Sequence, residues 1–188
     1  QGMPKVAIQK LKQIAREVPS ASQVYSSLGM VYEDMLSEIR KKNLLVSHSK
    51  NPDSEQAKKA VEAEAGGNTL ADEDVPDKLL AEQLDLARKA YGAYHVAAIL
   101  CKKDYMLWVR AADSAAEIAD LHSSVNDIPG IQVNVGHFHR REKERWLSEA
   151  KNDYKVADNL KPPGIDVPAK LASTLIQLGS LSEALTLL

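Results

Sequence analysis

The chain has 188 residues, of which 44% are hydrophobic and 27% are charged. Its formal net charge of −2 excludes a strong overall field for nucleic acid or acidic membranes. The single cysteine, Cys101, excludes an intramolecular disulfide framework and suits a reducing compartment. No apolar run has the length of a membrane span and no signal peptide is visible. Leu and Ala are abundant and Phe occurs once, so the composition favours an all-α fold. The chain begins at Gln1 and ends inside an amphipathic run, so we expect a piece of a longer protein.

The first predicted helix covers residues 5–16. Its apolar positions follow helical spacing, with basic side chains outward, and the inward set is Val6, Ala7, Leu11 and Ile14. Pro19 ends this helix and sets the turn that follows. The small Ala7 lets a second helix approach closely.

The second predicted helix runs from residue 23 to at least 35 and at most 42, and it carries one apolar stripe. The stripe recurs at i, i+3 and i+7 and consists of Tyr25, Leu28 and Tyr32. Gly29 beside it removes a side chain and so permits a close helix contact. A small residue, Pro, an aromatic residue, Leu-Gly and Tyr at these spacings fit the signature of tetratricopeptide (TPR) repeats, which are helix–turn–helix units. Residues 1–44 are therefore predicted to be TPR helices.

Residues 45–77 interrupt the periodic pattern. The part from Ser47 to Asp77 contains eight acidic residues against three lysines and few large aliphatic residues. Such a segment cannot bury enough apolar surface to offset the entropy lost on ordering. We expect a flexible acidic insertion, acting either as a solvated loop or as an acidic docking segment.

Periodicity returns in residues 78–122, which are predicted to be TPR-like helices. Ala90 and Tyr94 repeat the small-x3-large pattern, and Trp108 lies eighteen residues beyond Ala90. Tyr25 lies eighteen residues beyond Ala7, so the same offset occurs twice. This recurrence is the best internal evidence for a repeat array.

The last two segments of the chain are residues 123–164 and 165–188. Residues 123–164 are predicted to be an irregular linker with a charged helix over 137–159. Val133 and Val135 alternate like the residues of a strand. A single strand would have no partner to pair with, so a loop is favoured here. Residues 165–188 are predicted to start a further TPR-like repeat, with the helix beginning at Asp166 or Pro168. Its repeat positions are Leu171, Ala172 and Ala184.

No residue pattern here favours catalysis, so we expect no enzyme, no cofactor and no metal. His137 and His139 could ligate a metal, but two ligands do not complete a zinc site. Cys101 has only His95 as a nearby histidine, on a different helix face, which favours a small apolar filler over a nucleophile. Phosphate-binding glycine loops, nucleophile elbows and metalloprotease helices are absent from the sequence.

A basic cluster in the charged helix has two interpretations, nucleic-acid contact or an exposed helix that is solvated or faces a partner. Its members are Arg140, Arg141 and Arg145, next to Trp146. Glu142 and Glu144 nearly neutralise it, which favours the second interpretation.

If the chain is a TPR stack, its first helices line a groove that accepts a partner helix or peptide. The predicted partner-binding residues flank the packed stripes and are Ser26, Ser27, Met30, Glu33, Arg110 and Asp113. Glu33 and Arg110 are expected to be solvated.

Three short stretches carry a resemblance to a known family: Leu-Gly-Met-Val-Tyr-Glu-Asp at 28–34, Trp-Val-Arg at 108–110 and Pro-Gly-Ile-Asp-Val at 163–167. Together with the repeat blocks around them, they resemble the TPR subunit of transcription factor IIIC, a general factor of RNA polymerase III. The resemblance implies a nuclear protein–protein interaction scaffold. Its partners would be other transcription factor IIIC subunits and subunits of transcription factor IIIB, without a membrane and without direct nucleic-acid contact. The alternatives are an unrelated TPR adaptor of a chaperone or RNA-processing complex, and a helical enzyme domain or nucleic-acid binder outside the repeat class.

Overall fold

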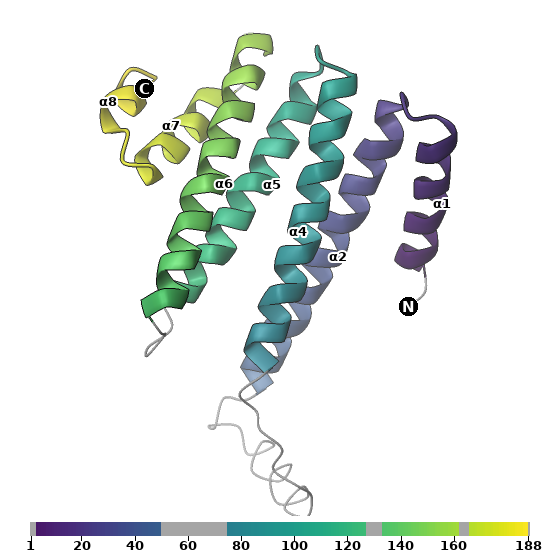
Figure 1. The fold of residues 1–188 in the computed structure, drawn as a ribbon, viewed down its shortest axis with the longest axis horizontal. Helices are drawn as coiled ribbons and strands as arrows, with labels where there is room; N and C mark the ends of the chain where they lie inside the picture. The colour runs from purple at the N-terminus through teal and green to yellow at the C-terminus, as the bar shows by residue number, and fades with distance from the viewer. Residues whose placement is uncertain (1–2, 50–74, 127–132, 162–165, 188) are drawn as a thin grey trace, which may run out of the picture.

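The computed structural model describes residues 3–49, 75–126, 133–161 and 166–187. Within these ranges the chain forms seven α-helices and no β-strand, which confirms the all-α prediction. The helices pack consecutively, each against its neighbour in the chain, in an arrangement compatible with an α-solenoid (Figure 1). Their bounds are α1 Met3–Glu17, α2 Ser22–Ser49, α4 Val75–Leu100, α5 Tyr105–Asn126, α6 Val133–Leu160, α7 Val167–Gln177 and α8 Leu181–Leu185.

The two predicted helical hairpins are present, since α1 packs on α2 and α4 packs on α5. Helix α1 ends at Glu17, two residues before Pro19, as the proline rule predicts. The described ends of the predicted insertion, 45–49 and 75–77, are helical and extend α2 and α4. Helix extension adds one backbone hydrogen bond per residue, so polar residues can continue a helix that packing has already started. The prediction of a flexible insertion otherwise falls on residues 50–74, which lie outside the described residues.

The helix lengths depart from the TPR pattern. Helices α2, α4, α5 and α6 contain 28, 26, 22 and 28 residues. A TPR repeat of about 34 residues has to hold two helices and their turns. The described architecture is therefore a stack of long helical hairpins.

The predicted inner face of α1 is partly wrong. Ile8 and Leu11 are the residues of α1 that pack against the core. Val6 and Ile14 are instead exposed, and Ala7 is half-buried beside them. The apolar stripe of α1 is broader than the contact with α2, so spacing alone could not tell which part of it is covered.

Gly29 fulfils the role predicted for it, but with a different helix. A Cβ atom at this position would lie 2.6 Å from Cε1 of Tyr94, so the ring of Tyr94 on α4 occupies the space that the glycine leaves. Tyr94 is completely buried as a result. Gly29 thus sets the close approach of α2 to α4, not of α2 to α1.

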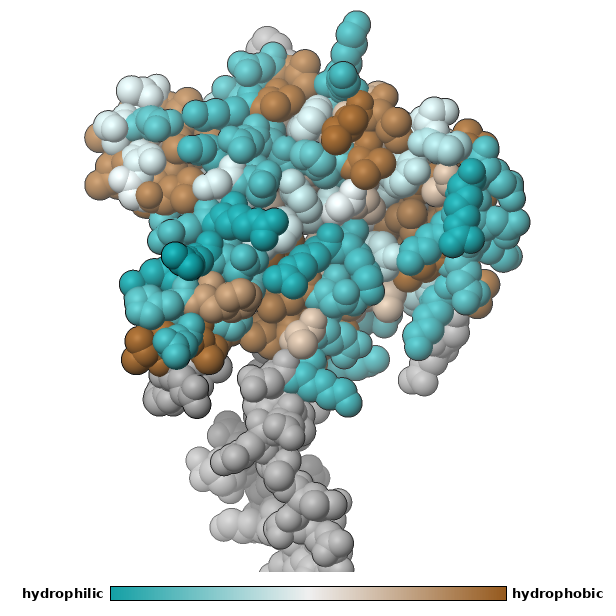
Figure 2. Space-filling view, in the orientation of Figure 1, coloured by the Kyte–Doolittle hydropathy of each residue, from teal (hydrophilic) through white to brown (hydrophobic). Residues whose placement is uncertain are grey.

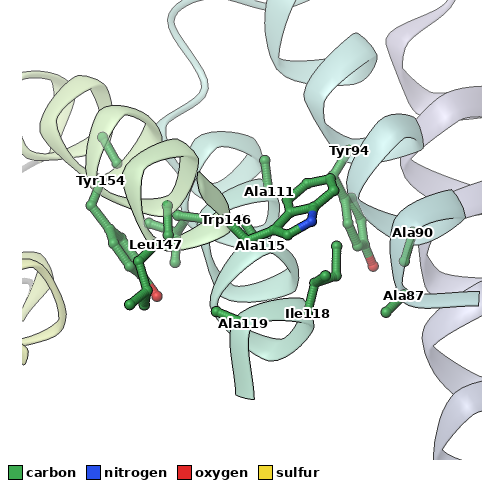
Figure 3. Close-up of a cluster of buried hydrophobic side chains, with 14 of the residues drawn as sticks. Ala87, Ala90, Tyr94, Ala111, Ala115, Ile118, Ala119, Trp146, Leu147 and Tyr154 are labelled. Atoms are coloured by element: carbon green, nitrogen blue, oxygen red, sulfur yellow. The ribbon is translucent and has the colours of Figure 1, made fainter. Parts of the chain in front are cut away.

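The core combines small and large side chains. Alanines on α4 and α5 let these helices approach closely, and Tyr94, Trp146, Leu147 and Tyr154 fill the spaces beside them (Figure 3). The alanines labelled in Figure 3 are Ala87, Ala90, Ala111, Ala115 and Ala119. Of the other predicted repeat positions, Leu28, Tyr32, Leu171, Ala172 and Ala184 are buried and Tyr25 and Trp108 are half-buried.

The charged helix predicted over 137–159 is present, but the described residues around it do not form the predicted irregular linker. Helix α5 continues to Asn126, and α6 occupies Val133–Leu160 without a break. Val133 and Val135 belong to its first turn and not to a loop. The apolar positions of α6 follow helical spacing, and they bury this helix despite its many charges.

The start of α7 agrees with its prediction. Asp166 is the N-cap, and its Oδ1 accepts a hydrogen bond of 3.3 Å from the backbone N–H of Ala169. Pro168 occupies the first helical turn, where a missing N–H costs nothing. Gly179, with φ of 76°, adopts the left-handed conformation that ends α7 before α8.

Candidate functional site

A hydrogen-bonded group of three side chains connects α2, α4 and α5. The Tyr94 hydroxyl donates to Oε2 of Glu33 over 2.6 Å. Nη1 of Arg110 donates to the Tyr94 hydroxyl over 3.2 Å and lies 3.4 Å from the same Glu33 oxygen. The Arg110 guanidinium also lies over the Tyr94 ring, 5.6 Å from its centroid. We call this arrangement of carboxylate, tyrosine and cation the first tyrosine clamp.

The first tyrosine clamp changes the acid–base properties of its members. Burial raises the pKa of Glu33, against the lowering effects of the Tyr94 hydrogen bond and the Arg110 charge. Burial and the neighbouring Glu33 carboxylate raise the pKa of Tyr94. At neutral pH Tyr94 therefore stays protonated and serves as the donor.

A second tyrosine clamp connects α5, α6 and α7. The Tyr154 hydroxyl donates to Oδ1 of Asp113 over 2.5 Å. Nζ of Lys170 donates to both carboxylate oxygens of Asp113 over 2.7 Å. Burial and the Asp113 hydrogen bond raise the pKa of Tyr154. The same three chemical roles thus recur one hairpin further along the stack.

The two clamps share a sequence register. Tyr94 precedes its cation Arg110 by sixteen residues, and Tyr154 precedes its cation Lys170 by sixteen. Each tyrosine also follows a buried alanine by four residues: Ala90 in α4 and Ala150 in α6. The carboxylates do not follow this register. The repeat of Ala-x3-Tyr sixty residues apart is the signal that could have identified α6 as a stack helix, and the sequence interpretation missed it among the charges.

A groove lies between the clamps and contains both clamp carboxylates. Its cavity volume is about 290 Å³, and its lining is Glu33, Arg40, Asp113, Ala116, Glu117, Asp120 and Tyr154. Arg40 on α2 forms an ion pair with Glu117 on α5, which crosses this groove. Burial raises the pKa of Glu117, and the Arg40 charge opposes that shift. The groove is thus a polar surface built from α2, α5 and α6.

The structure brings together three of the six predicted partner-binding residues. Glu33 and Asp113 line the groove, and Arg110 pairs with Glu33 at the first clamp. The expectation that Glu33 and Arg110 are simply solvated is wrong: their side chains are 33% and 41% exposed and are bonded to each other. Met30 on the same helix is 41% exposed. Ser26 and Ser27 are half-buried.

The basic cluster does not form one continuous patch. Arg140 and Arg141 are exposed. Arg145 lies 3.6 Å from Glu142 and stacks over Trp146, whose ring is buried against α4 and α5. Figure 2 shows hydrophilic residues over most of the α4–α6 face, interrupted by separate hydrophobic patches.

The cysteine and the histidines considered as possible nucleophiles or metal ligands lie in separate parts of the structure. Cys101 is half-buried in the α4–α5 turn, against a small apolar cluster. His95 is paired with Asp153 of α6, Nδ1 to Oδ2 over 3.3 Å, and this hydrogen bond raises the pKa of His95. His137 is exposed, whereas His139 faces His122 on α5.

No group of three or more His, Cys, Asp or Glu within residues 3–49, 75–126, 133–161 and 166–187 is placed to hold a metal ion. None of the helices in these ranges is long and apolar enough to cross a membrane.

Comparison with known proteins does not assign the chain to a family. No protein-family model matches it, and no curated protein matches it at a significant level.

Proposed function

We propose that this chain is a protein–protein interaction scaffold of TPR-like hairpins with longer helices, part of a transcription factor IIIC subunit that helps recruit transcription factor IIIB in the nucleus. The fold contributes the coarse part of this proposal, a stack of consecutively packed helices. The short sequence stretches at 28–34, 108–110 and 163–167 contribute the family. The mechanism is non-covalent capture of a partner helix or extended peptide.

The observation that carries the scaffold proposal is the polar groove between the tyrosine clamps. It combines carboxylates and a cation on a rigid surface, and the clamps fix the neighbouring helices at defined positions. Pre-organised polar groups favour specific recognition because little side-chain entropy is lost when a partner binds. The exposed Met30 adds an apolar contact on α2.

The test is affinity purification from nuclear extract with the full chain as bait, followed by mass spectrometry. Recovery of transcription factor IIIB and IIIC subunits is the expected result. A groove variant, Asp120→Lys, is expected to lose these partners because it reverses an exposed charge in the lining. The matched control is Glu144→Lys, which makes the same charge change on an exposed position of α6.

Recovery of proteins other than transcription factor IIIB and IIIC subunits would change the proposed partners. Chaperone or RNA-processing proteins, lost in the groove variant and kept in the control, would favour an unrelated TPR adaptor. Equal recovery with wild type and both variants would reject the groove as the binding surface. Capture of nucleic acid alone would reject the scaffold.

A further inference from the structure

A pair of histidines, one fully buried and one half-buried, connects α5 and α6 near their adjoining ends. The His122 side chain on α5 is fully buried, and its Nδ1 lies 2.8 Å from Nδ1 of His139 on α6. On the other side of the ring, Nε2 of His122 lies 3.4 Å from Nη2 of Arg88 on α4. The scaffold function proposed above makes no use of this pair.

The charged groups around His122 come from two packed helices. Helix α4 contributes Arg88, and α6 contributes His139 and Glu142, whose carboxylate lies 3.7 Å from Arg88. Burial, then the charges of His139 and Arg88, lower the pKa of His122 to about 4, and Glu142 opposes them. His122 is therefore neutral at pH 7.

The geometry limits how many protons the pair can hold. Two Nδ1 atoms at hydrogen-bond distance share one hydrogen, so one ring donates and the other accepts. A proton on both Nδ1 atoms would set two N–H donors against each other, beside the donor-only guanidinium of Arg88. Any further contact that His139 makes leaves this limit on bound protons unchanged, because the limit is set by the two Nδ1 atoms that face each other.

We propose that the His122–His139 pair is an acid-sensitive latch, which holds the first turns of α6 on α5 and releases them when both rings are protonated. Two further contacts close to the histidine pair also connect the first turns of α6 to α5. Nζ of Lys143 donates to Oγ of Ser123 over 2.8 Å, and the 55% exposed ring of Phe138 meets His122 edge-on. Further along α6, the buried residues that begin at Trp146 keep the helix attached. The opening is therefore local.

The sign of the pH effect follows from the direction of the pKa shift. The pKa of His122 is lower in the folded chain than the usual value of about 6.5. The latch therefore stabilises fully above about pH 6.5, and its contribution is lost as the pH falls toward about 4. One additional bound proton lowers the closed-to-open ratio up to about tenfold for each pH unit.

The test is hydrogen–deuterium exchange of the full chain at about pH 7 and about pH 5, corrected for intrinsic exchange rates. Protection of the amides of residues 136–143 is expected to fall about tenfold or more on acidification. Protection of residues 150–157 should change little. The variant His122→Asn keeps a hydrogen-bonding group at the Nδ1 position and removes the ring whose pKa is lowered, so its protection should be similar at both pH values. His137→Asn removes an exposed histidine and should respond as wild type does.

Several outcomes would overturn the latch. They are unchanged wild-type protection of residues 136–143, equal loss in His122→Asn, and loss of protection along all of α6. If His122→Asn does not fold, an NMR titration of the wild-type histidine rings replaces it. A His122 ring that titrates near the usual value of about 6.5, with protection intact, would also reject the latch. Titration coupled to the loss of protection would support it.

Discussion

The space that Gly29 leaves on α2 is filled by the ring of Tyr94 on α4, because a Cβ atom at residue 29 would come within 2.6 Å of that ring. This contact positions the Tyr94 hydroxyl next to Glu33, one turn further along α2. A missing side chain and a buried hydrogen bond therefore act on the same tyrosine. The close packing of α2 on α4 and the first tyrosine clamp form one structural unit.

Gly29→Ala is expected to destabilise the chain even though alanine is the better helix former. The helix-propensity gain is about 1 kcal/mol, whereas forcing a methyl group into a packed core costs about 1–3 kcal/mol. The Tyr94 ring is fully buried and has little room to move. Urea unfolding followed by circular dichroism measures the difference. The control is Gly92→Ala, where a Cβ atom meets nothing within 4 Å and the propensity gain should appear alone. A stabilised Gly29→Ala variant would contradict the contact.

The tyrosine hydroxyls of the two clamps should contribute similarly to stability. Removing the hydroxyl in Tyr94→Phe or Tyr154→Phe breaks one hydrogen bond to a carboxylate, which costs about 1–2 kcal/mol. The measurement is urea unfolding of each variant and of the double variant. The clamps use different helices except for α5, so the two losses should nearly add. A loss below about 0.3 kcal/mol in either variant would show that its clamp does not stabilise the stack.

Charge reversal at the first clamp is expected to lower the stability of the fold. Arg110→Glu sets a second carboxylate against Glu33, whereas the unmodified pair is 3.4 Å apart. Both side chains are about one-third exposed or more, so the expected loss is only about 0.5–1 kcal/mol. Adding Glu33→Arg should recover part of it by restoring opposite charges. Thermal unfolding of the single and double variants tests this. No recovery in the double variant would mean that the pair does not interact in solution.

The part of the fold that local spacing specifies could be predicted from sequence. The stripe of Tyr25, Leu28 and Tyr32 and the eighteen-residue offset predicted the α1–α2 and α4–α5 hairpins, because residues on one helix face recur at fixed intervals. Helix α6 was predicted as a charged helix over 137–159 but was assigned to a linker and not to the packed stack, because its charges outnumber its apolar residues. The apolar side chains at 146, 147, 150, 154 and 157 still follow helical spacing, and packing depends on that spacing more than on mean hydropathy.

The candidate site could be predicted only in part. Glu33, Arg110 and Asp113 were selected from sequence because they flank the packed stripes. The tyrosine and lysine partners of Glu33 and Asp113 could not be selected in this way, since Tyr94 lies 61 residues from Glu33 and Lys170 lies 57 residues from Asp113. Contacts of that separation depend on how the hairpins stack. Spacing within a single helix contains no information about them.

His95 and Asp153 connect α4 to α6, and the stability that their contact adds depends on pH in the opposite sense from the latch. The hydrogen bond to Asp153 raises the pKa of His95 above its usual value of about 6.5. The stabilisation is therefore fully present below about pH 6.5 and is lost as the pH rises through the higher folded-state pKa. Thermal unfolding between about pH 6.5 and 9 should show a falling midpoint in wild type.

Asp153→Asn is expected to flatten this alkaline decline, because an amide does not favour the charged imidazolium. Its stability should be lower than wild type at about pH 6.5 and should approach wild type at about pH 9. His137→Gln, at an exposed position, should keep the wild-type profile. The two histidine contacts thus act in separate pH ranges, His122 below about pH 6.5 and His95 above it. An Asp153→Asn profile parallel to wild type throughout would contradict the assigned pair.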